Sequence, residues 1–87
     1  MDLARGWVAC EIKNGLFDNE VAVSVKDRDG KTVSLFVDKG LVDDNSTPSR
    51  LMVYFPVDSQ TPRALLPTES FETGSRWLEM ASVPEAA

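Results

Sequence analysis

The chain has 87 residues, 43% of them hydrophobic and 26% charged, which is the composition of one small globular domain. This composition excludes a wholly disordered, collagen-like or disulfide-stapled chain. Nine Lys and Arg stand against fourteen Asp and Glu, and the resulting charge of −5 disfavours nucleic acid and anionic membrane surfaces as partners.

The single cysteine, Cys10, cannot form an internal disulfide, which predicts a reducing, cytoplasmic location. No apolar run is long enough for a membrane span, and the N-terminal residues have no apolar segment after their charges. We therefore expect neither a membrane segment nor a signal peptide. We expect a single domain over residues 1–87, with frayed ends at residues 1–5 and 83–87.

Apolar residues alternate with more polar ones in three early segments, which predicts three half-buried strands. The apolar positions are Val8, Cys10 and Ile12, then Val21, Val23 and Val25, and then Val33, Leu35 and Val37. We expect these strands to form an antiparallel meander over residues 7–38.

The turn between the second and third strands sets their register. A two-residue turn at Asp29-Gly30 would mix polar and apolar faces, so we reject it. A three-residue loop over residues 28–30, with Gly30 in the left-handed conformation, pairs Val25 with Val33 and keeps the apolar faces together.

The first hairpin is expected to turn at Asn14-Gly15, a strong signal for a two-residue turn. This register places Val8 opposite Val21 on the buried face. It also places Trp7 opposite Ala22 on the other face.

Later segments add shorter strands. Residues 50–57 predict a fourth strand, in which Pro56 favours an edge or a bulge because it lacks a donor. A short strand follows at residues 63–67. Residues 75–82 are a strand or a helix, and we favour the strand because eight residues are few for an unaided helix.

Five or six short strands separated by turns predict an all-β fold. We expect a small antiparallel barrel, SH3-like or OB-like, or a compact sandwich, beginning with the three-stranded meander.

Five large apolar side chains fall on the face turned away from the valine-rich core. Trp7 and Phe36 lie in one row with an alanine between them, and three more residues hold outer positions on later strands. Aromatic residues and Met are enriched at the centres of protein interfaces. We therefore predict a surface for a protein partner or a second copy, made of Trp7, Phe36, Met52, Tyr54 and Trp77.

Two alternatives remain open for these side chains. In one, the barrel closes over them or residues 68–82 pack across them, which makes a second small core. In the other, Trp7, Tyr54 and Trp77 line a pocket for a small ligand.

The sequence has no histidine, which removes the commonest general base and metal ligand. Cys10 lies in phase with the apolar face, which predicts a buried, inert thiol. Asp27-Arg28-Asp29-Gly30 resembles the opening of a calcium loop but lacks the closing Glu, so a hairpin turn is the better interpretation.

Four carboxylates in loops are the remaining candidates for catalysis, and they could act only if the loops brought them together. They are Asp38, Asp43, Glu69 and Glu72. We predict a non-enzymatic module with no catalytic residue, no metal and no cofactor.

Overall fold

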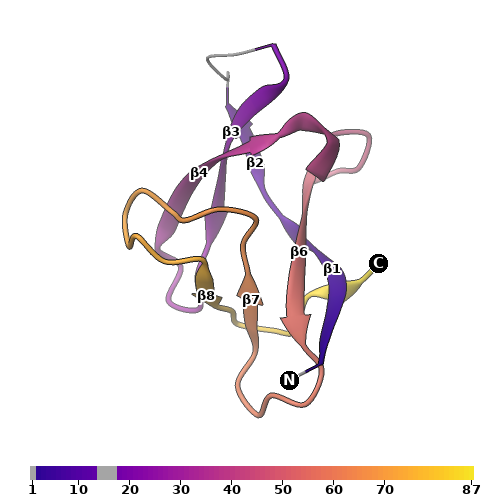
Figure 1. Ribbon diagram of the computed structural model, residues 1–87, viewed down its shortest axis with the longest axis vertical. Coiled ribbons are helices and arrows are strands. Elements are labelled where there is room, and N and C mark those ends of the chain that lie inside the picture. Colours follow the sequence, from indigo (N-terminus) through magenta and orange to yellow (C-terminus); the bar gives the residue numbers. More distant parts are fainter. Residues whose placement is uncertain (1, 14–17) are drawn as a thin grey trace.

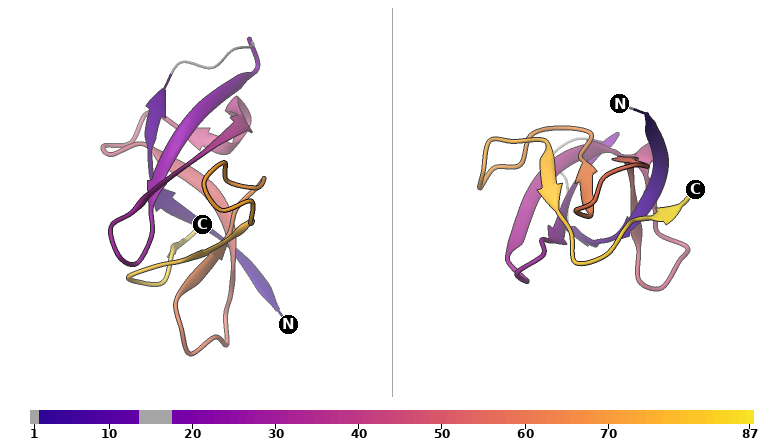
Figure 2. Two further views of the ribbon diagram at one scale, coloured as in Figure 1. Left: turned by 90° about the vertical axis from the view of Figure 1, so that its left-hand side faces the viewer. Right: turned by 90° about the horizontal axis from the view of Figure 1, so that it is seen from below.

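The computed structural model describes residues 2–13 and 18–87, which fold into two antiparallel sheets (Figures 1 and 2). The larger sheet has the strand order β8-β7-β6-β1-β9, with β5 also paired to β6, and the smaller sheet has the order β2-β3-β4. Among the described residues, no helix has the length and apolarity needed to cross a membrane. The all-β prediction is confirmed.

The elements, in chain order, are β1 (Leu3–Ala9), β2 (Glu11–Lys13), β3 (Glu20–Lys26), β4 (Thr32–Asp38), the 3-10 turn η1 (Lys39–Leu41), β5 (Val42–Asp43), β6 (Arg50–Pro56), β7 (Arg63–Leu65), β8 (Trp77–Glu79) and β9 (Glu85–Ala86).

The hairpin of β3 and β4 has the predicted register. Val25 lies opposite Val33, and Gly30 adopts a positive φ of 81° in the turn. One carboxylate oxygen of Asp27 accepts the N–H groups of Asp29 and Lys31, at 2.9 and 2.8 Å. The Asp27 side chain is thus held by the backbone of a hairpin turn, in agreement with that interpretation.

The predicted meander is wrong at its first strand. Residues 3–13 form two strands that part at Cys10: β2 pairs with β3, whereas β1 belongs to the other sheet. Val8 lies opposite Leu51 rather than Val21, and Lys13 takes the place opposite Ala22 that Trp7 was expected to hold. The predicted turn at Asn14-Gly15 lies outside the described residues.

β1 pairs with β6 instead of β3 because β6 provides a longer run of backbone hydrogen bonds. β1 pairs with β6 along its whole length, from Leu3 opposite Pro56 to Ala9 opposite Arg50. At the bend, the N–H group of Cys10 donates to the carbonyl oxygen of Ser49 at 2.9 Å. A long-range ladder has therefore replaced the local hairpin that the alternation suggested.

The later strands β6, β7 and β8 lie within the segments predicted for them, but they are shorter than predicted. Residues 77–79 are a strand with Leu78 facing the core, as expected. β6 lies inside the sheet, between β1 and β7, and tolerates Pro56 because this residue ends the strand.

The chain ends, expected to be frayed, are paired where the structure describes them. Residues 3–5 pair with β6, and Glu85 and Ala86 pair with Trp7 and Gly6 of β1. Asp2 also accepts a hydrogen bond from the N–H group of Val57, at 3.3 Å. β1 therefore lies between β6 and β9 in the larger sheet.

The core lies between the two sheets, which do not close into one barrel (Figure 2). Both sheets contribute their inward positions. Among the described residues, this core cluster consists of Val8, Cys10, Val23, Val25, Val33, Leu35, Val37, Leu51, Val53, Ala64, Leu66 and Leu78.

The outer edge of β4 is covered by the loop of residues 68–75. The carbonyl oxygen of Ser34 accepts the N–H group of Phe71 at 2.9 Å, and the Ser34 N–H donates to Glu72 Oε1 at 2.6 Å. The Ser34 hydroxyl donates to Glu72 Oε2 at 2.9 Å. The hydrogen bonds from the backbone and hydroxyl of Ser34 lower the pKa of Glu72, and together with the Phe71 bond they occupy an edge that could otherwise pair with another chain.

Candidate functional site

Four of the five side chains predicted to bind a partner lie on one face of the larger sheet. Trp77, Leu65 and Tyr54 are ladder partners on β8, β7 and β6, and Met52 lies opposite Trp7 on β1. Their neighbours in β6, β7 and β8 point into the core instead. We call this surface the outer face; it consists of Trp7, Met52, Tyr54, Leu65 and Trp77.

Leu65 was missed as a member of this face. Its neighbours Ala64 and Leu66 are both fully buried, so alternation along the predicted strand at residues 63–67 places Leu65 outward. The alternation was visible in the sequence. The segment is too short, however, to tell which of its two faces points into the core unless the neighbouring strands are known.

Phe36 lies apart from the outer face, on β4 of the smaller sheet. Its ring meets that of Phe71 edge to face, with centroids 5.1 Å apart, and Phe71 is itself 63% exposed. The expected row from Trp7 to Phe36 is wrong because β1 left this sheet. One alternative had residues 68–82 packing across all five side chains. The structure shows such a contact at Phe36, through Phe71.

Arginine side chains stack on both tryptophans of the outer face. The guanidinium carbon of Arg50 lies 4.6 Å from the centroid of the Trp7 ring, and that of Arg63 lies 4.5 Å from the Trp77 ring. Such contacts combine cation–π attraction with apolar packing. Trp7 is half-buried, whereas Trp77 and Tyr54 remain 39% and 44% exposed.

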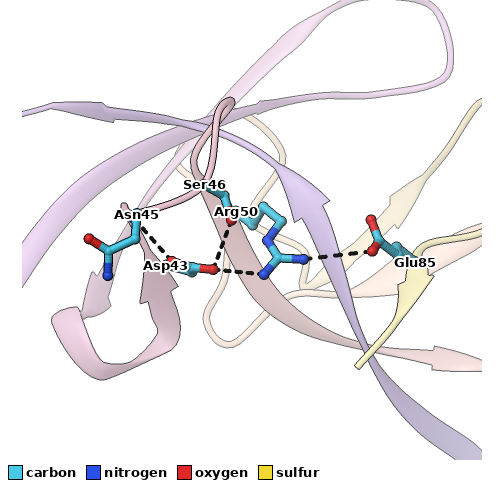
Figure 3. Close-up of polar contacts among 5 residues, drawn as sticks. All are labelled: Asp43, Asn45, Ser46, Arg50 and Glu85. Carbon is cyan, nitrogen blue, oxygen red and sulfur yellow. Dashed lines mark hydrogen bonds and ion pairs between the residues drawn. The ribbon is translucent and has the colours of Figure 1, made fainter.

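Arg50 also joins two carboxylates from different elements (Figure 3). Its Nη2 donates to Asp43 Oδ2 at 2.7 Å, and its Nη1 lies 3.7 Å from Glu85 Oε1. Asp43 further accepts the Ser46 hydroxyl at 2.9 Å and the Asn45 N–H at 3.0 Å. The hydrogen bond from Arg50 is the main reason that the pKa of Asp43 is lowered.

This cluster predicts a loss of stability in acid. A carboxyl group whose pKa is depressed on folding stabilises the fold above its unfolded pKa of about 4, and this stability is lost as the pH falls through the folded pKa. Asp43→Asn should therefore flatten the acid limb of a plot of unfolding free energy against pH, leaving the slope due to Glu72. Asp44→Asn, which keeps the ion pair with Arg50, is the matched control. Equal acid limbs in the two variants would contradict the assignment.

Three of the four carboxylates considered for catalysis, all except Glu69, are engaged separately. Asp38 Oδ1 accepts the Gly40 N–H at 2.8 Å and caps η1, Asp43 binds Arg50, and Glu72 binds Ser34. In the ranges that the structure describes, no group of three or more His, Cys, Asp or Glu could hold a metal ion.

One alternative placed Trp7, Tyr54 and Trp77 together around a ligand pocket. Trp7 lines a pocket of about 480 Å³, but Tyr54 and Trp77 do not; Cys10 lies on its wall. Cys10 is buried, and burial raises the pKa of its thiol, which keeps the sulfur protonated and poorly nucleophilic.

Two features therefore stand out on this chain: the outer face and the pocket beside Cys10. They share Trp7, and their other residues are different. No family model matches the chain, and comparisons with curated proteins and with solved structures gave no match.

Proposed function

We propose that this chain is a non-enzymatic protein-interaction module that self-associates through its outer face. The observation that carries the proposal is the exposure of Tyr54 and Trp77, at 44% and 39%, on either side of Leu65 in one ladder row. Large aromatic side chains in an exposed, contiguous patch are typical of the centres of protein interfaces.

The charges around the outer face support contact with a second copy. Arg63 lies opposite Glu79, and Arg50 is bound by Asp43 and Glu85. Although the whole chain carries −5, cationic and anionic side chains thus lie side by side around the aromatic side chains. Two copies meeting through this face would avoid the like-charge repulsion expected between their acidic surfaces.

We also infer that the two sheets are an opened barrel of the SH3-like or OB-like kind. The short strands, the bend at Cys10 and the shared core of the two sheets support this inference. A single buried cysteine fits a protein of the cytoplasm.

Sedimentation or light scattering over a concentration series tests the self-association. The mass of the wild type should rise towards that of a dimer, and Tyr54→Asp should remain a monomer across the series. Burying two additional carboxylates at one interface is costly, and a weakening of about a hundredfold or more is expected. Because Tyr54 is already 44% exposed, the circular dichroism spectrum should be unchanged.

Phe71→Asp is the matched control. It places the same charge at an exposed aromatic residue that packs on Phe36 of the smaller sheet and lies outside the outer face. This variant should associate like the wild type. A wild type that stays monomeric at every concentration would refute self-association, and dissociation by Phe71→Asp alone would move the interface to Phe36 and Phe71.

A further inference from the structure

The two sheets part along a seam where β1 leaves the smaller sheet. The ladder between β2 and β3 ends at Glu11 and Ser24, although β3 continues for two more residues paired with β4. On the N-terminal side of Glu11 the chain runs away from β3, and β1 lies beside β6, as Figure 1 shows. The seam thus lies between residues 8–10, at the end of β1 and the bend after it, and residues 25–26 of β3.

A pocket of about 480 Å³ opens at this seam, and the segment at residues 80–85 forms another of its walls. Its volume lies within the range usual for small-molecule sites. Apolar side chains from four segments line it: Val8, Cys10, Val25, Pro48, Met80 and Val83. Val83 is 59% exposed, so an apolar occupant would remove further apolar surface from water.

Three charged groups line this pocket: the cation Lys26 and the carboxylates Glu11 and Glu85. Lys26 and Glu11 both line it, and the Lys26 ammonium donates to the Thr32 hydroxyl at 3.1 Å. Glu85, the other carboxylate there, lies 3.7 Å from Arg50. The lining therefore carries no excess of positive charge to attract an anion, and Glu85 already faces Arg50, so the apolar wall is what remains to bind a ligand.

We propose that this seam pocket binds one small, uncharged, apolar molecule. Binding would be reversible and non-covalent, held by the apolar side chains of both sheets and the segment at residues 80–85. The site shares the half-buried Trp7 with the outer face but not the exposed Tyr54 and Trp77, so ligand binding does not require self-association.

The proposal can be tested with N-phenyl-1-naphthylamine, an uncharged apolar fluorophore. Trp7 lines the pocket and Trp77 does not, so Trp77→Phe leaves the pocket tryptophan as the one emitter. Titration should show saturable binding at one site per chain, with energy transfer from Trp7 to the probe. Wild type and Trp77→Phe should bind equally well.

Val83→Asp supplies the decisive variant, since it places a carboxylate on the apolar wall at an exposed position. It should weaken probe binding about tenfold or more. Val57→Asp is the matched control, because Val57 is 52% exposed and lies outside the pocket. It should bind the probe like the wild type, and so should Tyr54→Asp, whose change lies on the outer face.

Three results would overturn the proposal: no saturable binding, binding without energy transfer from Trp7, or equal weakening by Val83→Asp and Val57→Asp. Loss of probe binding in Tyr54→Asp would also overturn it, because the probe would then report the outer face. A monomeric wild type that still binds the probe would refute self-association and leave this site standing.

Discussion

Leu66→Ala is expected to lower the free energy of unfolding by about 2–5 kcal/mol. Leu66 is fully buried just after β7, and its backbone is held on both sides. Its N–H donates to the carbonyl oxygen of Arg76 at 2.7 Å, and its own carbonyl oxygen accepts Arg76 Nε at 2.9 Å. The backbone therefore cannot move inward to fill the cavity, and the loss is a large part of the stability of a domain this small.

Leu65→Ala is the matched control, because the same atoms are removed one residue earlier from the half-buried outer face. This variant should lose clearly less than Leu66→Ala, since part of the removed surface already faces water and no enclosed cavity is left. Urea denaturation followed by circular dichroism measures both. Equal losses, or a larger loss for Leu65→Ala, would contradict the assigned inward and outward faces of β7.

The second large effect is expected at Gly6, where the larger sheet has no room for a side chain. A Cβ atom there would lie 2.7 Å from Phe55 Cε1 and 2.8 Å from the carbonyl oxygen of Glu85. Gly6→Ala should therefore cost about 1–3 kcal/mol and displace β9, the shorter of the two strands beside β1.

Hydrogen exchange of the backbone amides locates this damage. Faster exchange is expected at residues 85–86, with the β3–β4 hairpin unchanged. Gly40→Ala serves as the control, because its nearest contact would be the Asp38 carboxylate at 3.2 Å and its backbone has no positive φ. Unaltered exchange in β9 would show that Gly6 can accept a methyl group.

Local patterns were enough to predict the β3–β4 hairpin. Val25 opposite Val33 and Gly30 in the left-handed conformation both follow from alternation and turn chemistry within a short stretch of chain. The strand at residues 77–79 could be predicted in the same way.

Partners distant in the sequence could not be predicted from local pattern. Val8 alternates correctly with its neighbours, but alternation does not reveal whether Val21 or Leu51 lies opposite. The wrong partner for this strand also made the candidate site wrong in part, because the row from Trp7 to Phe36 required Trp7 to lie opposite Ala22. Outward orientation was correct for Tyr54 and Trp77, since it depends on the alternation of each strand alone.

The place of β1 in the larger sheet also bears on the order in which the chain assembles. The β3–β4 hairpin joins neighbouring segments, whereas β1 must find β6 across much of the chain and then β9 at residues 85–86. Folding is slower when a long loop must close before stabilising contacts form, because loop closure costs conformational entropy. The smaller sheet can therefore begin to form while the N-terminal strand still has no ladder, and the larger sheet is completed only when the two ends of the chain meet.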